Sequence, residues 1–168
     1  SSAANTTITE MTSASVRSAA QTSTKFQVRN RMILRREHLA AIVAHARETA
    51  PAECCGLISS INGSRSSSIY RLKNVRPDSD RAYEAAPEEL FAAQRQMRER
   101  GEDLLAIYHS HPRSNNPTPS ETDVRLAYYP AATYLIIGLG GEQPIVQAFL
   151  ISEQRAYWEQ VEYVISDE

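Results

Sequence analysis

The sequence has few cysteines and no long apolar run. Its two cysteines, Cys54 and Cys55, are adjacent in 168 residues and cannot easily bridge to each other, which argues against a disulfide framework. No stretch approaches the roughly 20 apolar residues that a membrane helix needs. The N-terminus has no basic stretch followed by an apolar one, as a secretory signal would have. A reducing, cytoplasmic location without membrane attachment is therefore expected.

The chain also lacks an excess of charge of either sign. Its 18 Lys and Arg residues face 20 Asp and Glu residues, which gives a net charge of −2. No overall basic field attracts nucleic acid or an anionic membrane, so neither is an expected partner. With 42% hydrophobic and 23% charged residues, the composition is that of a globular protein with one domain.

Large apolar side chains are scarce at the start of the chain. Residues 1–24 are rich in Ser, Thr and Ala, so they bury too little to offset the entropy of ordering them. This segment is predicted to be a flexible tail or tether. Residues 25–168 are predicted to form the folded domain.

Regular hydrophobic patterns begin after residue 25. Turn signals at Asn62-Gly63, the stop at Pro51 and the helix-start position of Pro87 mark the boundaries between elements. The weak alternation of residues 156–165 fits either a strand or a helix. The mixed order predicts an α/β or α+β sandwich around one curved sheet. Helices are predicted at residues 36–49 and 87–100 and from Ser120 through Ala127, and strands at residues 32–34, 54–60, 66–75, 104–108, 134–139 and 145–151.

Two histidines and an aspartate have the spacing of a metal site. His109 and His111 follow a predicted strand, and both side chains can point to the same side if that strand continues through them. A helix that begins near Ser120 can bring Asp123 back beside them. Two imidazoles and one carboxylate leave the fourth position of a tetrahedral zinc open, which is typical of a catalytic rather than a structural site.

A catalytic zinc site also needs a group that transfers protons. Glu53 is the candidate, because it lies at the mouth of a predicted buried strand and its carboxylate could overhang the metal. Ser120 or Ser110 could donate a hydrogen bond to an oxyanion. The simpler alternatives are a solvated loop acid for Glu53, a helix cap for Ser120 and a first-turn acid for Asp123.

These residues form a long motif of fixed spacing. The run His-Ser-His-Pro at residues 109–112 is followed, after seven residues, by Ser-x-x-Asp at residues 120–123. Residues 51–57 read Pro-x-Glu-Cys-x-Gly-Leu. Together they resemble the motif of the JAMM or MPN-plus zinc metalloproteases, and the resemblance covers residues 32 to about 151. Short segments such as Glu-Cys-Cys-Gly-Leu and Pro-Ser-Glu-Thr-Asp resemble those of the compact bacterial branch of that family.

The resemblance implies a single JAMM/MPN domain of α/β, cytidine-deaminase-like fold, with a curved mixed sheet flanked by helices. It implies one zinc ion held by His109, His111 and Asp123, and Glu53 as the general acid and base. By analogy, Ser120 stabilises the tetrahedral intermediate. Family members often pair, so a homodimer is possible.

The family hydrolyses amide or isopeptide bonds after a ubiquitin-like C-terminus, and bacterial relatives act on small sulfur-carrier proteins. The implied substrate is therefore a ubiquitin-like or sulfur-carrier protein cut after its diglycine tail. Such a tail is thin enough for a narrow groove. Residues 76–85 and 113–118 flank the site in sequence and are the candidate groove segments.

Two other functions compete with this interpretation. A non-catalytic MPN-type scaffold typically loses ligands, whereas every motif position is present here. A zinc deaminase needs Cys-x-x-Cys, which this chain lacks. Cys54 and Cys55 could be a nucleophile or metal ligands, but plain strand residues on opposite sides are expected. Tyr128 and Tyr129 could contact substrate, but packing is the expected role.

Overall fold

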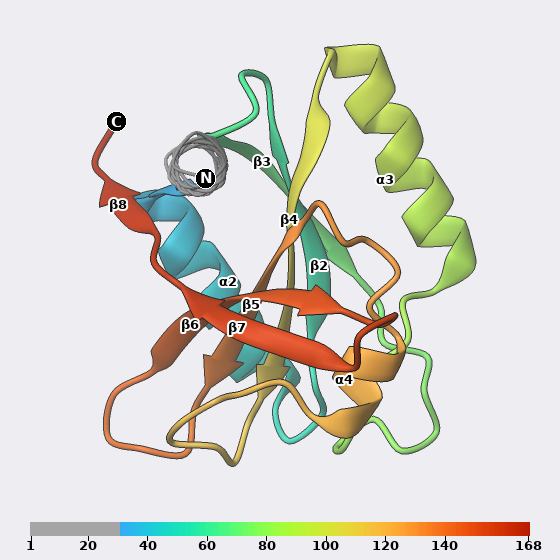
Figure 1. The fold of residues 1–168 in the computed structure, drawn as a ribbon, viewed down its shortest axis with the longest axis vertical. Helices are drawn as coiled ribbons and strands as arrows, with labels where there is room; N and C mark the ends of the chain where they lie inside the picture. Colours follow the sequence, from blue (N-terminus) through green and yellow to red (C-terminus); the bar gives the residue numbers. More distant parts are fainter. Residues whose placement is uncertain (1–30) are drawn as a thin grey trace, which may run out of the picture. The chain divides into compact units, whose positions relative to one another are not determined.

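The computed structural model describes residues 31–168. Its helices and strands alternate along the chain, and Figure 1 shows them arranged around one twisted sheet. The elements are β1 (Ile33–Arg35), α2 (Arg36–Thr49), β2 (Cys55–Ser60), β3 (Ser66–Leu72), α3 (Pro87–Arg100), β4 (Asp103–His111), α4 (Glu121–Arg125), β5 (Thr133–Gly138), β6 (Ile145–Ser152), β7 (Tyr157–Val161) and β8 (Val164–Ser166).

The main sheet has six strands in the order β3-β2-β4-β5-β6-β7. Only the central pair β4 and β5 is parallel, and every other neighbouring pair is antiparallel. Strands β1 and β8 form a separate two-stranded parallel sheet. The predicted α/β fold with a mixed sheet flanked by helices is confirmed.

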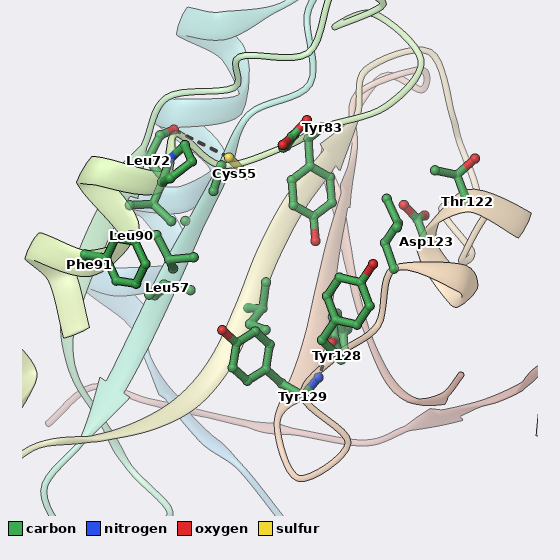
Figure 2. Close-up of a pocket in the computed structure, with 17 residues that line it drawn as sticks. Cys55, Leu57, Leu72, Tyr83, Leu90, Phe91, Thr122, Asp123, Tyr128 and Tyr129 are labelled. Atoms are coloured by element: carbon green, nitrogen blue, oxygen red, sulfur yellow. Dashed lines mark hydrogen bonds between the residues drawn. The ribbon is translucent and has the colours of Figure 1, made fainter. Parts of the chain in front are cut away.

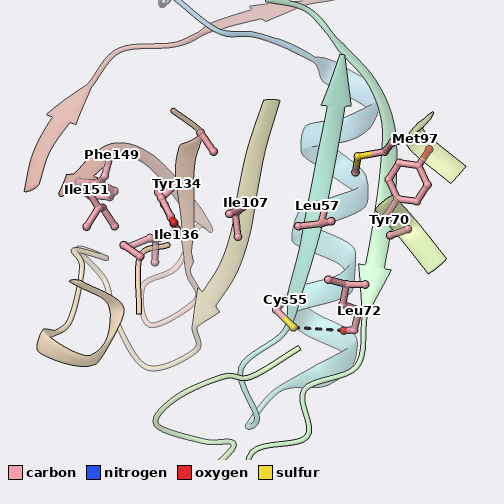
Figure 3. Packing of buried hydrophobic residues seen from close by; sticks show 13 residues of the cluster. Cys55, Leu57, Tyr70, Leu72, Met97, Ile107, Tyr134, Ile136, Phe149 and Ile151 are labelled. Atoms are coloured by element: carbon pink, nitrogen blue, oxygen red, sulfur yellow. Dashed lines mark hydrogen bonds between the residues drawn. The ribbon is translucent and has the colours of Figure 1, made fainter. Parts of the chain in front are cut away.

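The two long helices cover opposite faces of the sheet. Because successive strand residues point to opposite faces, the sheet contributes to two apolar clusters. Ala93 and Met97 of α3 pack in one cluster with Leu57 and Ile107 of the sheet (Figure 3). The other cluster joins α2 to the other face through Ile42 and Ala46. The adjacent Cys54 and Cys55 belong to different clusters, as expected of plain strand residues.

Gly56 is required by the packing of Tyr108, the residue directly before His109. The two residues are paired across β2 and β4, and a Cβ at Gly56 would overlap the Tyr108 ring. That ring is fully buried, and its hydroxyl is 2.8 Å from Nδ1 of His45 on α2. The glycine of the sequence motif therefore fixes the strand that leads into the two histidines.

One helix prediction is wrong in its end, one open alternative is decided as strand, and one prediction lies outside the described residues. The helix after Ser120 was expected to include Leu126 and Ala127, but it ends at Arg125. Residues 156–165 contain no helix; they form β7 and enter β8. The tail predicted at residues 1–24 lies outside the described residues. Within residues 31–168, no helix combines the length and apolar character needed to cross a bilayer.

Candidate metal centre

Strand β4 carries both histidines on one face of the sheet. It was predicted to end at Tyr108 but continues through His111, so His109 and His111 share a face and Ser110 points the other way. Ser110 is fully buried, and its hydroxyl accepts a hydrogen bond of 2.8 Å from the Cys54 amide. The suggestion that Ser110 could donate to an oxyanion is therefore wrong, because its side chain lies on the opposite face from the histidines.

A capping box brings Asp123 to the histidines. The Asp123 amide donates to Oγ of Ser120 at 3.1 Å, and the Ser120 amide donates to Oδ2 of Asp123 at 2.9 Å. This reciprocal pair satisfies two free amides at the helix start and holds the aspartate side chain in one orientation. Helix α4 has only five residues, so this cap, more than the length of the helix, defines it.

The three side chains meet at one point. Nε2 of His109 lies 3.2 Å from Nε2 of His111, and Oδ2 of Asp123 lies 3.1 Å and 3.0 Å from these two nitrogens. Zinc bonds of about 2.05 Å in tetrahedral geometry place ligand atoms about 3.3 Å apart, so the triangle fits a zinc ion with little adjustment. One atom of Glu53 joins the group, and all four donor atoms lie within 4.8 Å of one another.

Glu53 lies just before β2, beside these three side chains. Its side chain is almost inaccessible, with 3% of the residue surface exposed, and its Oε1 has no hydrogen-bond partner among the described residues. Burial raises the pKa of Glu53 from 4.5 to about 7, although His111 acts in the opposite direction. A buried carboxylate without a partner is costly, which argues against a solvated loop acid and for a group that a cation or a water completes.

Asp123 and His111 stabilise each other's charged forms. Burial by itself would raise the pKa of Asp123, but the two histidines outweigh it and hold that pKa well below its usual range. Burial would lower the pKa of His111, but the hydrogen bond to Asp123 outweighs it and raises that pKa. A divalent cation would displace the proton that His111 holds, so binding should release protons and weaken as the pH falls.

Because Glu53 is protonated more easily in the folded state, it makes the stability of the metal-free protein depend on pH. Its contribution is fully present below pH 4.5 and is lost as the pH rises through about 7. We expect metal-free Glu53→Gln to be more stable than the parent by about 3 kcal/mol at pH 8, and equal to it near pH 4. Urea unfolding at both pH values measures this. A Glu99→Gln variant on the exposed face of α3 should show no such difference, and a pH-independent gap for Glu53→Gln would contradict the assignment.

An apolar pocket of about 300 Å³ adjoins the cluster. Asp123 belongs to the cluster and also lines the pocket. Leu90 and Phe91 of α3 form one side, Tyr128 and Tyr129 lie across from them, and Tyr83 points toward the space between (Figure 2). Phe91 is 64% exposed and Tyr128 is 65% exposed. The prediction that Tyr128 and Tyr129 are packing residues is wrong. Helix α4 ends before them, and both side chains line the pocket.

Only one of the two candidate groove segments lies along the pocket. Residues 83–85 of the first segment line the pocket, whereas no residue of 113–118 does. The second segment is joined to the first by an ion pair of 3.5 Å between Arg113 and Asp80. Tyr83 lies within the predicted segment, but the sequence did not indicate that its ring stacks on that of His109, at 4.6 Å between centroids. Nothing in the local sequence pattern distinguishes this tyrosine from an ordinary loop residue.

Comparisons with known proteins agree with this geometry. The chain is similar to the desampylase of Haloferax volcanii, with 37% identity over 106 residues, which are 60% of this chain and 76% of that protein. It is 32% identical over 106 residues to a CysO-cysteine peptidase of Mycobacterium tuberculosis, covering 63% and 72% of the two chains. A probable TtuB-protein conjugate cleaving protease of Thermus thermophilus is 38% identical over 111 residues, covering 66% and 69%.

A solved structure and a family match cover most of the domain. The solution structure of a protein from Desulfitobacterium hafniense superposes with a TM-score of 0.72 at 30% identity, covering 82% of this chain and 94% of that one. Residues 35–152 match the family described as prokaryotic homologs of the JAB domain. This confirms the JAMM/MPN resemblance of the sequence motif. Since the match spans well over half of the chain, the protein belongs to the family of prokaryotic JAB-domain homologs.

Proposed function

We propose that this protein is a zinc-dependent peptidase that hydrolyses the amide bond after the diglycine C-terminus of a ubiquitin-like or sulfur-carrier protein. The observation that carries the proposal is the convergence of His109, His111, Asp123 and Glu53 at the end of an apolar pocket. Three of these groups are the donors of an open catalytic zinc site, and the fourth is a buried acid with a raised pKa.

His109, His111 and Asp123 would hold the zinc ion. When bound, zinc acts as a Lewis acid that polarises a carbonyl and lowers the pKa of a water to about 7. Glu53 then accepts a proton from the attacking water and returns it to the nitrogen of the leaving amine. Its place in the cluster suits both transfers, since the carboxylate is buried and its donor atom lies within 4.8 Å of the three other donor atoms.

Ser120 would stabilise the oxyanion of the tetrahedral intermediate. As the cap of α4, its Oγ accepts from the Asp123 amide, which leaves the hydroxyl hydrogen free to donate. Its own amide is bonded to Oδ2 of Asp123, so the serine is held beside the cluster. One such donor typically contributes a few kcal/mol to lowering the barrier. Capping and oxyanion binding are therefore compatible in one residue.

The pocket supports a substrate with a thin tail and an apolar residue upstream. Tyr83 and Asp123 line the part of the pocket next to the cluster, and two glycines would need the least space beside them. The exposed rings of Phe91 and Tyr128 then offer an apolar surface to the residue that precedes them. The carrier body would remain outside the pocket.

The names of the relatives suggest two kinds of leaving group. One relative is named for the removal of cysteine from a carrier, and another for the cleavage of a carrier–protein conjugate. Only a short segment separates Asp123 from β5, and it contains no element beyond the end of α4. A single amino acid or short peptide is therefore the leaving group that this site fits best, because little structure stands near it to grip a second folded protein.

A panel of carriers tests the proposal. The full-length protein with zinc is incubated with ubiquitin-like and sulfur-carrier proteins that extend past diglycine by one cysteine, by a short peptide or by an isopeptide-linked protein. Mass spectrometry should show release after the second glycine, and carriers with Gly→Ala in the tail should resist cleavage. If no carrier is cut while zinc is bound at one equivalent, the peptidase proposal fails and the non-catalytic scaffold is favoured.

A further inference from the structure

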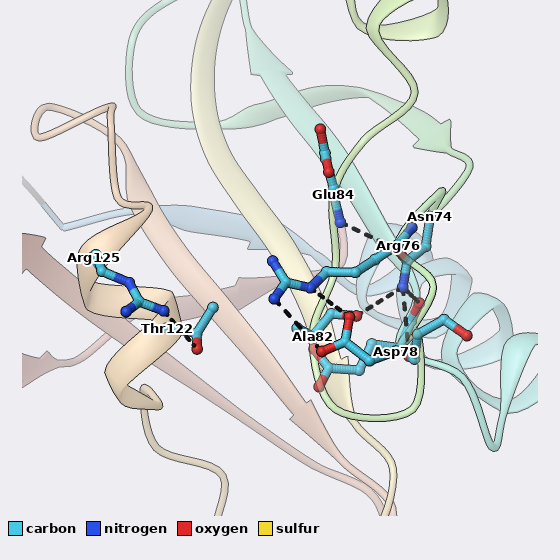
Figure 4. Close-up of polar contacts among 9 residues, drawn as sticks. Asn74, Arg76, Asp78, Ala82, Glu84, Thr122 and Arg125 are labelled. Atoms are coloured by element: carbon cyan, nitrogen blue, oxygen red, sulfur yellow. Dashed lines mark hydrogen bonds and ion pairs between the residues drawn. The ribbon is translucent and has the colours of Figure 1, made fainter.

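The side chain of Asn74 joins three parts of the chain around the four-residue cluster. Asn74 follows β3 and is paired by a β-bridge with Ala85, so it closes the base of the loop at residues 75–84. Figure 4 shows its amide at the centre of the polar contacts of this loop. All its hydrogen bonds go to backbone atoms, so they restrain the course of the chain rather than another mobile side chain.

The amide nitrogen of Asn74 restrains Glu53. Nδ2 donates to the Glu53 carbonyl at 3.0 Å, and the Glu53 amide donates to the Ser79 carbonyl of the same loop at 2.6 Å. Both backbone polar groups of Glu53 are thus bonded to the loop. Because Oε1 of Glu53 has no hydrogen-bond partner among the described residues, its carboxylate is aimed at the cluster mainly by the backbone.

The same asparagine restrains Tyr83 from both sides. Nδ2 also donates to the Ala82 carbonyl at 3.0 Å, and Oδ1 accepts from the Glu84 amide at 3.1 Å. Between them, the Tyr83 ring lies nearly parallel to the His109 ring, at an angle of 28°. Nδ1 of His109 is buried without a partner among residues 31–168, so it lacks the hydrogen bond that usually orients a ligand histidine. The stacked tyrosine supports the ring face of His109, in addition to the edge-to-face contact with His111.

We infer that Asn74 is a positioning residue, which holds the Glu53 carboxylate over the cluster and the Tyr83 ring against His109 at the same time. It touches no donor atom of the cluster and acts through these two residues. The inference rests on the proposed peptidase function. In it, the side-chain amide of Asn74 keeps Glu53, the proposed proton-transfer group, aligned with the proposed metal ligands. Misplacing a reacting group by about 1 Å costs on the order of 100-fold in rate.

The variants Asn74→Ala and Asn74→Asp test this in the full chain. The aspartate keeps an acceptor for the Arg76 and Glu84 amides but cannot donate to the carbonyls of Glu53 and Ala82. For both variants we expect equimolar zinc, a KM close to that of the parent, and a kcat about 10- to 100-fold lower on a cleavable carrier. The acid limb of the pH–rate profile should also move, since Glu53 leaves its buried position.

Asn62 provides the matched control. Its Oδ1 accepts from the backbone amides of Ser64 and Arg65 at 3.0 and 2.9 Å, and so holds the turn between β2 and β3 in a similar way. Asn62→Ala should lower the melting temperature, as a lost turn contact does, without changing kcat or the pH profile. If Asn74→Ala and Asn62→Ala lose kcat only in proportion to lost folded protein, Asn74 is structural and the inference is overturned.

A second readout does not depend on activity. In the metal-free protein, hydrogen exchange at the amides of Glu53 and Glu84 should be at least about 10-fold faster in Asn74→Ala than in the parent, and unchanged in Asn62→Ala. Unchanged exchange at Glu53 would overturn the inference even if the variant were inactive. If the parent itself cuts no carrier, the proposed function fails, and the exchange measurement still decides whether Asn74 holds Glu53.

Discussion

Replacing Glu53 by glutamine should abolish most of the hydrolysis and leave the metal in place. The change removes the buried acid beside His109, His111 and Asp123, and a positioned acid–base group typically contributes 10²- to 10⁴-fold. We therefore expect kcat on a cleavable carrier to fall by roughly 100-fold or more, with equimolar zinc by elemental analysis. The amide has nearly the shape of the carboxyl group, so the fold should be retained.

The metal-free stability of this variant makes the result easier to interpret. A buried carboxylate whose Oε1 has no partner among the described residues should cost stability, and Glu53→Gln should remove that cost at pH 8. A variant that is inactive but more stable cannot owe its inactivity to unfolding. Glu99→Gln, on the exposed face of α3, should leave both activity and stability unchanged. Full activity in Glu53→Gln would disprove the mechanism, whatever the zinc content.

The parts of the site that sequence could predict are those fixed by local periodicity. His109 and His111 are two residues apart on a strand, and Ser120 and Asp123 are three apart at a helix start, so each pair shares a face by backbone geometry alone. The same reasoning separates Ser110 from the histidines once the strand is known to continue. Local periodicity does not predict that the end of β4 lies beside the start of α4. That proximity was expected only from the resemblance to the family motif.

The loop around Asn74 could not be predicted for a physical reason. Its bonds join residues up to 21 positions apart, and an asparagine after a strand predicts only a turn. The contact of Tyr83 with His109 likewise depends on how that loop folds back over the sheet. Tyr128 and Tyr129 were misassigned because adjacent aromatic residues suit a core, whereas the short helix α4 directs them into an open pocket.

Replacing His109 or Asp123 by alanine should remove zinc and activity together. A site with three protein donors has none to spare, and the three atoms lie within 3.2 Å of one another. We expect less than about 0.1 equivalents of zinc in either variant after desalting, and loss of hydrolysis to background. In the parent, a chelator should inhibit and added zinc should restore activity.

Zinc-dependent stability separates loss of a ligand from loss of the fold. Zinc at about 1,000 times its Kd should stabilise the parent by about 4 kcal/mol, which raises Tm by on the order of 10 °C. Both variants should fold at a lower Tm that no longer responds to zinc. His38→Ala is the control, because His38 lies outside the cluster and contacts Ser66 at 2.7 Å, and it should keep the full zinc response. One equivalent of zinc in His109→Ala or Asp123→Ala would contradict the ligand assignment, because it would show that Glu53 or another residue replaces the lost donor.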